Sequence, residues 1–238
     1  MFVRETRERI TLESARGAEP HTTLGAAAIF RRVSWTHAPL RAVSQAGLVN
    51  NLNDGVSWGL FPLVFVERGL SLERTASLVA IYPAVWGIAQ LFTGALSDRM
   101  GRRALMTAGM LLQGVALIVV AAGRSWGLWR TAMIALGLGT ALVYPTLLSA
   151  VSDHSPPSWR ATAIGVYRWW RDLGYVIGAI LAGAVADQIG IPASIRWVGV
   201  LTIVSGLIVA VTYREGATPR TDTHAEVVPA SARVMGRS

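Results

Sequence analysis

Charged and phenolic side chains share one helical face inside an otherwise apolar run near residue 170. Arg168, Arg171, Asp172 and Tyr175 stand at positions i, i+3, i+4 and i+7 of a helix, so they form one stripe. Guanidinium groups bind carboxylates and other anions through paired hydrogen bonds. The stripe could therefore bind an anionic substrate group, or exchange ion-pair partners between Asp172 and Asp54. The alternative is a static salt bridge that only fixes helix packing.

A second polar group lies in the first apolar run of the chain. Asn50, Asn51 and Asn53 accompany Asp54, which is the only acidic residue near the middle of that run. A carboxyl group removed from water is a candidate for proton coupling. The alternative is structural: the three asparagines could satisfy it by hydrogen bonds, or it could neutralise an arginine of the 161–186 run.

Four of the six apolar runs carry polar side chains, and we expect those four to line a water-filled cavity. A charge that meets lipid costs roughly 2.5–3.5 kcal/mol on insertion scales, so such residues face protein or water. The third and sixth runs are nearly pure Ala, Leu, Val, Ile and Gly, and we expect them to face lipid. The candidate cavity residues are Asn50, Asn51, Asn53, Asp54, Tyr82, Trp86, Gln90, Tyr144, Arg168, Arg171, Asp172 and Tyr175.

The apolar runs themselves are typical of a polytopic membrane protein. The chain of 238 residues is 52% hydrophobic, and its mean hydropathy is +0.43 although both ends are polar. Each run is long enough to cross about 30 Å of hydrocarbon as a helix. We predict an all-α fold with six transmembrane helices near residues 42–66, 76–97, 104–123, 129–151, 161–186 and 194–213.

A charged turn joins the second run to the third. Residues 94–103 read Gly-Ala-Leu-Ser-Asp-Arg-Met-Gly-Arg-Arg, so charged side chains cluster where one helix leaves the bilayer and the next enters. Gly94 and Gly101 would permit close packing and tight turning. Asp98 could bridge to arginines and to the N-terminus of a neighbouring helix. We expect this turn to act as a latch.

The frame Gly-Ala-x-x-Asp-x-x-Gly occurs twice, at residues 94–101 and 183–190. Three spans separate the copies, and an odd number of spans inverts the topology, as in the three-plus-three inverted repeats of transporters. Chance recurrence of small residues and an aspartate at helix ends is the alternative. Arginines are more numerous at the span ends on the side of both termini, which predicts that this side is cytosolic.

The polar ends set the predicted boundaries. We expect a cytosolic polar tail or linker over residues 1–38, the six-helix domain over 39–213 and a disordered cytosolic tail over 214–238. The short apolar patch at residues 24–30 is followed by arginines, so it is not a signal peptide. We expect it on the membrane surface or in a mobile tail.

The charged turn resembles the signature of the major facilitator superfamily, which runs Gly-x-Leu-Ala-Asp-Arg-x-Gly-Arg-Lys/Arg between the second and third helices of each half. Residues 50–55, 82–87 and 171–175 also look like the carboxy-terminal half of bacterial members, so the resemblance covers about residues 40–213. Members of this family typically have twelve helices in two halves, and this chain supplies one half. The matching residues, with Ser97 in place of alanine, are Gly94, Leu96, Asp98, Arg99, Gly101, Arg102 and Arg103.

The resemblance implies half of a secondary transporter, or a fragment of one, which moves a small solute by alternating access and is energised by an ion gradient. The implied partners are the lipid bilayer, the solute and another six-helix half, either a second copy or a chain encoded upstream. The implied location is a bacterial inner membrane. A non-transporting six-helix module or a degenerate remnant is the alternative.

Other functional classes lack their signatures. The net charge of +8 comes from scattered arginines that punctuate the apolar runs, which does not indicate nucleic-acid binding. The chain has no cysteine, and its four histidines lie in predicted tails or loops without metal-ligand spacing. We find no phosphate-binding loop and no nucleophile elbow. We therefore expect no enzyme activity, no cofactor and no metal.

Overall fold

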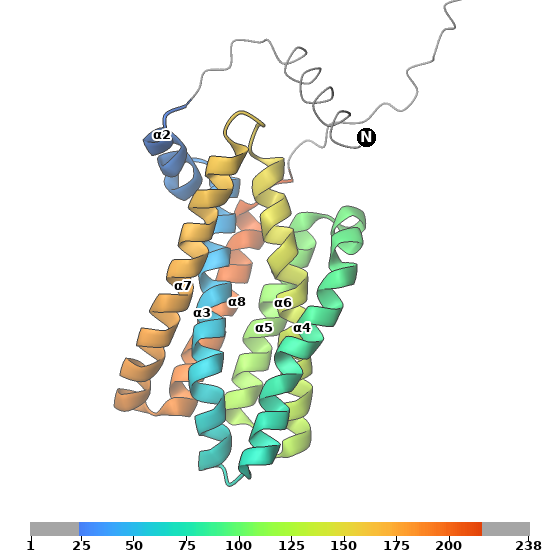
Figure 1. Cartoon of the computed structure of the whole chain (residues 1–238), viewed down its shortest axis with the longest axis vertical. Coiled ribbons are helices and arrows are strands. Elements are labelled where there is room, and N and C mark those ends of the chain that lie inside the picture. The colour runs from blue at the N-terminus through green and yellow to red at the C-terminus, as the bar shows by residue number, and fades with distance from the viewer. Residues whose placement is uncertain (1–23, 216–238) are drawn as a thin grey trace, which may run out of the picture.

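The computed structural model describes residues 24–215, apart from the side chains of Asp98 and Ala182. Figure 1 shows these residues as long helices that run side by side with short connections. They contain no strand, so the all-α prediction is confirmed. Both predicted tails lie largely outside the described residues. The long helices are α3 (Ala38–Glu67), α4 (Leu72–Met100), α5 (Arg102–Ala122), α6 (Trp126–Asp153), α7 (Arg160–Ile189) and α8 (Ile191–Thr212).

Each predicted span overlaps one of the six long helices. Among the described helices, α4 to α8 are long and apolar enough to cross a membrane. α3 has 30 residues, and therefore a length of about 45 Å, but it is more polar at its centre. Asn50, Asn53 and Asp54 are buried there, where α3 packs against α4, α6, α7 and α8. α3 is thus the polar helix within an apolar bundle.

Two glycine turns bear out the predicted internal repeat. Gly101 between α4 and α5 has φ 86° and ψ 147°, and Gly190 between α7 and α8 has φ 85° and ψ 152°. Side chains are rarely tolerated in this conformation, which explains the glycines. The Gly101 N–H donates to the Ser97 carbonyl oxygen at 3.1 Å, and the Gly190 N–H donates to the Ala186 carbonyl oxygen at 2.8 Å. The two turns lie at opposite ends of the bundle (Figure 1), as an inverted repeat requires.

α3 and α7 approach each other through glycines of α7. A Cβ atom added to Gly174 would lie 2.9 Å from Leu48 Cα, and one added to Gly178 would lie 2.9 Å from Leu52 Cα. Cβ atoms do not pack this closely against a backbone, so both positions require glycine at this helix separation. The close approach of α3 and α7 thus depends on the two glycines of the Gly174-x-x-x-Gly178 spacing.

A short helix packs against one end of the bundle before α3 begins. α2 (Ala26–Arg31) continues into a π-helical turn, η1 (Arg32–Thr36). Ile29 and Val33 are buried in a core cluster with side chains of α3, α6, α7 and α8. Trp170 of α7 also donates from Nε1 to Ser34 Oγ at 2.8 Å. The apolar patch at residues 24–30 therefore belongs largely to a helix that is docked on the bundle.

Candidate functional site

Asp54 is buried where α3, α4 and α6 meet. Only 8% of its surface is exposed, and its Oδ1 accepts a hydrogen bond from the Tyr82 hydroxyl of α4. Thr140 Oγ1 of α6 lies 3.3 Å from the same Tyr82 oxygen and 3.0 Å from the Leu136 carbonyl, to which it donates. One chain of polar atoms therefore joins three helices at Asp54.

Asn50 and Asn53 face a different group, the buried interface of α3 with α5 and α8. Gln113 of α5 donates to Asn50 Oδ1 at 3.0 Å and accepts from Asn53 Nδ2 at 3.1 Å. Thr202 of α8 donates to Asn53 Oδ1 at 2.8 Å. All four residues are at most 1% exposed. The two asparagines therefore do not line a wet cavity here, contrary to expectation, because side-chain amides of α3 and α5 and the Thr202 hydroxyl of α8 satisfy one another inside the bundle.

Gln113 and Thr202 were not predicted as polar partners. They lie in the third and sixth apolar runs, which were expected to face lipid, but the Gln113 side chain is fully buried. A lone amide in the middle of an apolar run is itself the signal of an interior position, because its hydrogen-bonding groups find no partner in lipid.

Arg171 of α7 binds α6 as well as its own neighbour. Its Nη1 donates to the Tyr144 hydroxyl at 2.8 Å, and its guanidinium carbon lies 5.5 Å from the centre of the Tyr144 ring. Nε and Nη2 donate to Asp172 Oδ1 at 2.8 and 2.7 Å. The ion pair is therefore with Asp172 and not with Asp54, and α6 and α7 are joined by a charge-assisted hydrogen bond.

Aromatic rings fill the space between the Asp54 and Arg171 groups. Tyr82 and Trp86 of α4 stack with ring centroids 6.3 Å apart, and Trp86 meets Tyr144 edge-on at 5.5 Å. Trp58 of α3 lies 6.2 Å from Tyr82 and is 43% exposed. Trp58 was not predicted as a cavity residue, because a single aromatic residue in an apolar run gives no polar signal. A row of rings from α3, α4 and α6 thus connects the two polar groups.

The remaining predicted cavity residues are more widely spread. Asn51 Oδ1 is buried without a hydrogen-bond partner among the described residues. Gln90 of α4 is exposed, as are Arg168 and Tyr175 of α7. In the most apolar 18-residue stretch of each helix, 17% of the stretch is buried in α4 and 12% in α7, against 56% in α5. In the described part of the chain, α4 and α7 are thus the helices least covered by the rest of the bundle, and we call them the open helices.

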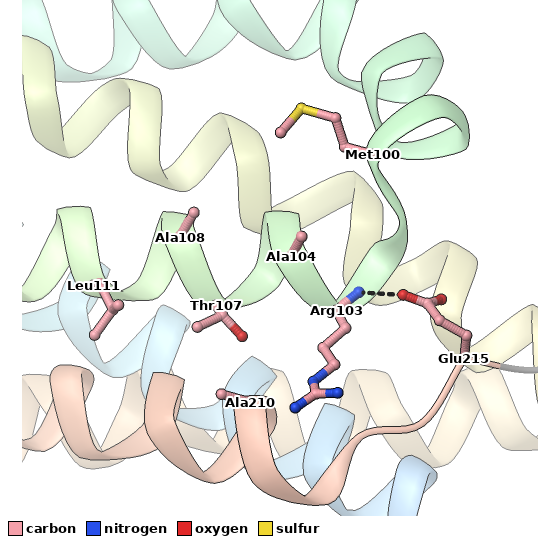
Figure 2. A pocket seen from close by; sticks show the side chains of 8 residues that line it. All are labelled: Met100, Arg103, Ala104, Thr107, Ala108, Leu111, Ala210 and Glu215. Atoms are coloured by element: carbon pink, nitrogen blue, oxygen red, sulfur yellow. Dashed lines mark hydrogen bonds between the residues drawn. The ribbon is translucent and has the colours of Figure 1, made fainter.

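The charged turn between α4 and α5 is tied to two other helix ends. Arg102 donates from Nε to Asp153 Oδ2 of α6 at 2.7 Å and from Nη1 to Ser97 Oγ at 2.6 Å. The backbone N–H of Arg103 donates to Glu215 Oε1, just beyond α8, at 2.9 Å (Figure 2). The predicted link of this turn to neighbouring helices thus has a basis in Arg102 and Arg103.

Other residues of the turn contribute less to packing than expected. The Asp98 side chain lies outside the described residues, so its predicted bridge stays a prediction. Leu96 and Arg99 are exposed. Among described atoms, none lies within 4 Å of a Cβ added to Gly94. The tight packing expected at Gly94 is therefore absent in the described structure, and Gly101 alone carries a conformational requirement.

Two histidines meet at the same end of the bundle. The rings of His37 and His154 lie 5.6 Å apart, and His37 Nδ1 accepts from the Leu40 N–H at 3.4 Å as the cap of α3. Burial, then the charge of Arg32, then His154 lower the pKa of His37 below its ordinary value. In the described part of the chain, no three metal-ligating side chains gather in one place.

Comparison with known proteins gives one family. The family model described as Major Facilitator Superfamily matches residues 44–235. The inner membrane transport protein YnfM of Escherichia coli K12 is 29% identical over 152 residues, which are 63% of this chain and 36% of that protein. The glucose-6-phosphate exchanger SLC37A2 of Bos taurus is 25% identical over 182 residues, covering 74% of this chain and 34% of the exchanger. The chain thus spans about a third of these relatives.

Solved structures share the fold. A peptide transporter POT in complex with alafosfalin superimposes with a TM-score of 0.69 at 17% identity, over 81% of this chain and 43% of that one. A POT family transporter in complex with 5-aminolevulinic acid gives a TM-score of 0.62 at 16% identity, over 77% and 44%. At these identities the likeness concerns the arrangement of helices.

Proposed function

Because this chain belongs to the Major Facilitator Superfamily, we propose that it forms one six-helix half of a carrier that moves a small solute across a membrane by alternating access. The proposed location is a bacterial inner membrane, with both termini and the α4–α5 turn on the cytosolic side. Transport would be energised by an ion gradient. The family, the relatives named as transporters and the inverted repeat all support this proposal.

The observation that carries the proposal is that polar bonds join the two three-helix repeats at the centre of the bundle. Tyr82 of the first repeat lies 3.3 Å from Thr140 Oγ1 of the second, and Thr202 of the second repeat donates to Asn53 Oδ1 of the first at 2.8 Å. Alternating access moves helices against each other around a central site. Such movement would break or exchange these hydrogen bonds, so each bond would form in some conformational states and not in others.

The two polar groups would have different roles. Asp54 is proposed as the carboxyl group that couples transport to protons, with the Tyr82 hydroxyl as its partner. Arg171 and Arg168 are proposed to bind an anionic group of the solute, and Asp172 would release Arg171 when the solute arrives. The rings of Trp58, Trp86 and Tyr144 would provide the walls, together with Asn51, Gln90 and Tyr175.

The open helices α4 and α7 support pairing with another six-helix half. Phe92 on α4 is 70% exposed and Ile180 on α7 is 65% exposed. Exposed Gln90, Arg168 and Asp172 lie on the same two helices, and polar groups such as these are costly against lipid. We propose that a partner half, either a second copy of this chain or a separately encoded one, covers these helices and encloses a water-filled cavity.

Flux through reconstituted vesicles tests the proposal. The full chain is reconstituted alone and together with the part of the Escherichia coli relative that lies outside the match. Entry of labelled citrate, glucose 6-phosphate and a fluorescent quinolone is then followed under an imposed pH gradient. We expect saturable, gradient-dependent flux of at least one probe in one preparation, and loss of the gradient dependence in Asp54→Asn. No flux above empty vesicles in either preparation would favour a non-transporting module.

A further inference from the structure

A groove with no part in the proposed cavity lies on another side of the bundle, where η1 and the ends of α3 and α8 meet α7. We call it the interfacial groove and define it by Trp35, Arg41, Leu48, Trp170, Ile208 and Thr212, which line it. Arg41 lies in the first turn of α3 and Thr212 is the last residue of α8. The groove is thus at the depth where helices of a membrane protein pass from hydrocarbon to headgroups.

Hydrogen bonds hold the walls of the interfacial groove in place. Trp170 donates to Ser34 Oγ at 2.8 Å, and its ring meets Trp35 edge-on with centroids 5.5 Å apart. Arg41 donates from Nη1 to the Trp35 carbonyl at 3.2 Å. A guanidinium has five N–H donors, so this one bond fixes Arg41 at the groove and leaves donors for an anion. Tryptophan and arginine together are typical of the membrane interface.

The groove is open to the side on which α8 is bare. Ile208 is 43% exposed, Leu207 50% and Val211 83%, so lipid chains would lie directly against this part of α8. The groove volume is about 280 Å³, slightly less than the roughly 300–1,000 Å³ of pockets that enclose a whole small molecule. It fits one part of a longer molecule whose remainder lies outside, along the exposed face of α8.

Charge distinguishes the interfacial groove from a second groove at the same end of the bundle. The second groove, shown in Figure 2, is lined by Arg103 but also by Glu215, whose carboxylate already lies at the N-terminus of α5. The interfacial groove is lined by Arg41 and by no acidic residue. It is therefore the positively charged one of the two.

We propose that the interfacial groove binds one anionic phospholipid. The headgroup phosphate lies on Arg41, and the first part of an acyl chain lies between the tryptophans and Ile208. The bound lipid fills the space between η1 and the bundle and fastens this segment to the membrane. Basic pockets between transmembrane helices bind anionic headgroups by the same chemistry. The proposal does not depend on transport.

Native mass spectrometry of the purified full chain in detergent tests this proposal. The protein is titrated with palmitoyl-oleoyl phosphatidylglycerol, with the phosphatidylcholine of the same chains, and with inorganic phosphate. One arginine near a membrane surface changes affinity for an anionic lipid about fivefold. We expect one phosphatidylglycerol to bind about fivefold more tightly than phosphatidylcholine. Arg41→Gln should lower the affinity for phosphatidylglycerol by the same factor, and Arg41→Lys should restore most of that affinity.

Arg160→Gln is the matched control. Arg160 is an exposed arginine at the same end of the bundle and also donates to one backbone carbonyl, that of Ser155 at 3.0 Å, but it does not line the groove. Ile208→Trp is a second variant, which fills the groove without a change of charge. We expect phosphatidylglycerol binding to be unchanged in Arg160→Gln and lost in Ile208→Trp.

Three results would overturn the proposal. Equal binding of the two lipids would remove the role of charge. Equal losses in Arg160→Gln and Arg41→Gln would mean that lipids bind anywhere on the basic end. Displacement of the lipid by millimolar inorganic phosphate would mean that the groove takes a soluble anion. Size-exclusion profiles check that each variant is folded.

Discussion

Arg171 contacts both a neighbouring helix and an exposed acidic residue of its own helix. It is only partly exposed, with 18% of its side-chain surface accessible, and it binds Asp172, whose side chain is 63% exposed. Its bond to Tyr144 reaches a second helix. The part of the guanidinium that faces α6 thus contributes to helix packing, and under the proposed function the part that faces Asp172 would exchange partners.

The first prediction concerns the Arg171–Tyr144 bond. Tyr144→Phe removes the hydroxyl but keeps the ring, and Arg171→Lys keeps the charge but not the planar set of donors. We expect each change to lower the free energy of unfolding, with a coupling of about 0.5–3 kcal/mol in the double variant. Chemical denaturation in detergent measures it. Additive effects would mean that the bond contributes nothing.

At the residue scale, the sequence predicted polar positions within the helices but not always the surroundings of their side chains. Asp54 and Arg171 were recognised because charges are rare inside apolar runs. Asn50 and Asn53 were grouped with Asp54 because they are close in sequence, yet their side chains face α5 and α8. Helical neighbours one residue apart point about 100° apart, so the facing helix decides the partner, and Gln113 was not recognised as that partner.

At the scale of helices, close approach and caps determine how the elements fit. The second prediction compares two glycines of α7. Gly174→Ala would push a Cβ into the backbone of Leu48, whereas described atoms leave the corresponding space at Gly183 open. We expect Gly174→Ala to lower the free energy of unfolding by about 1–3 kcal/mol through overpacking. Gly183→Ala should be neutral or stabilise by up to about 1 kcal/mol through helix propensity.

Thermal unfolding of the two alanine variants in the same detergent provides the comparison. Because both changes are made on one helix and add the same methyl group, helix propensity affects them alike. Equal midpoints for the two variants would show that α3 and α7 do not meet at Gly174.

The third prediction concerns the His37 cap of α3. Its pKa is lowered by burial, by Arg32 and by His154, so the folded protein favours neutral His37 more than the unfolded chain does. The resulting stability is fully present above the ordinary histidine pKa and is lost as pH falls through the lowered value. Protonation also removes the acceptor for the Leu40 N–H.

Unfolding midpoints between pH 5 and pH 8 measure this dependence. We expect the midpoint to fall toward pH 5, and to fall less in His37→Asn, because asparagine is a good helix cap without a charge. A pH profile unchanged by His37→Asn would assign the dependence to another group.

Helix boundaries were largely predictable because the bilayer fixes them. The glycine turns at Gly101 and Gly190 followed from a repeated sequence frame, and both have the same conformation. The docking of α2 on the bundle was not predictable, since a short apolar patch does not indicate whether it meets lipid or protein. The hydrogen bond from Trp170 to Ser34 and the burial of Ile29 show that this segment packs against protein.

At the scale of the molecule, the exposure of α4 and α7 needs an explanation. In a lone bundle in lipid, the Arg168, Asp172 and Gln90 side chains would meet hydrocarbon at a cost of several kcal/mol. The cost disappears if a partner half covers α4 and α7 and water enters between the halves. The resemblance to a twelve-helix family predicts one half of a larger carrier, and the exposed faces of α4 and α7 indicate which surface another half would cover.

Water accessibility of single cysteines gives the sharpest test of a water-filled cavity beside α4 and α7, because the chain has no cysteine of its own. Asp172→Cys on α7 and Val115→Cys on α5 lie at similar distances from the same end of the bundle, and Val115 is 51% exposed. In unbroken membranes, a charged, membrane-impermeant maleimide should label Asp172→Cys at least several-fold faster than Val115→Cys. Equal rates, or faster labelling at position 115, would contradict a water-filled cavity on the α4–α7 side.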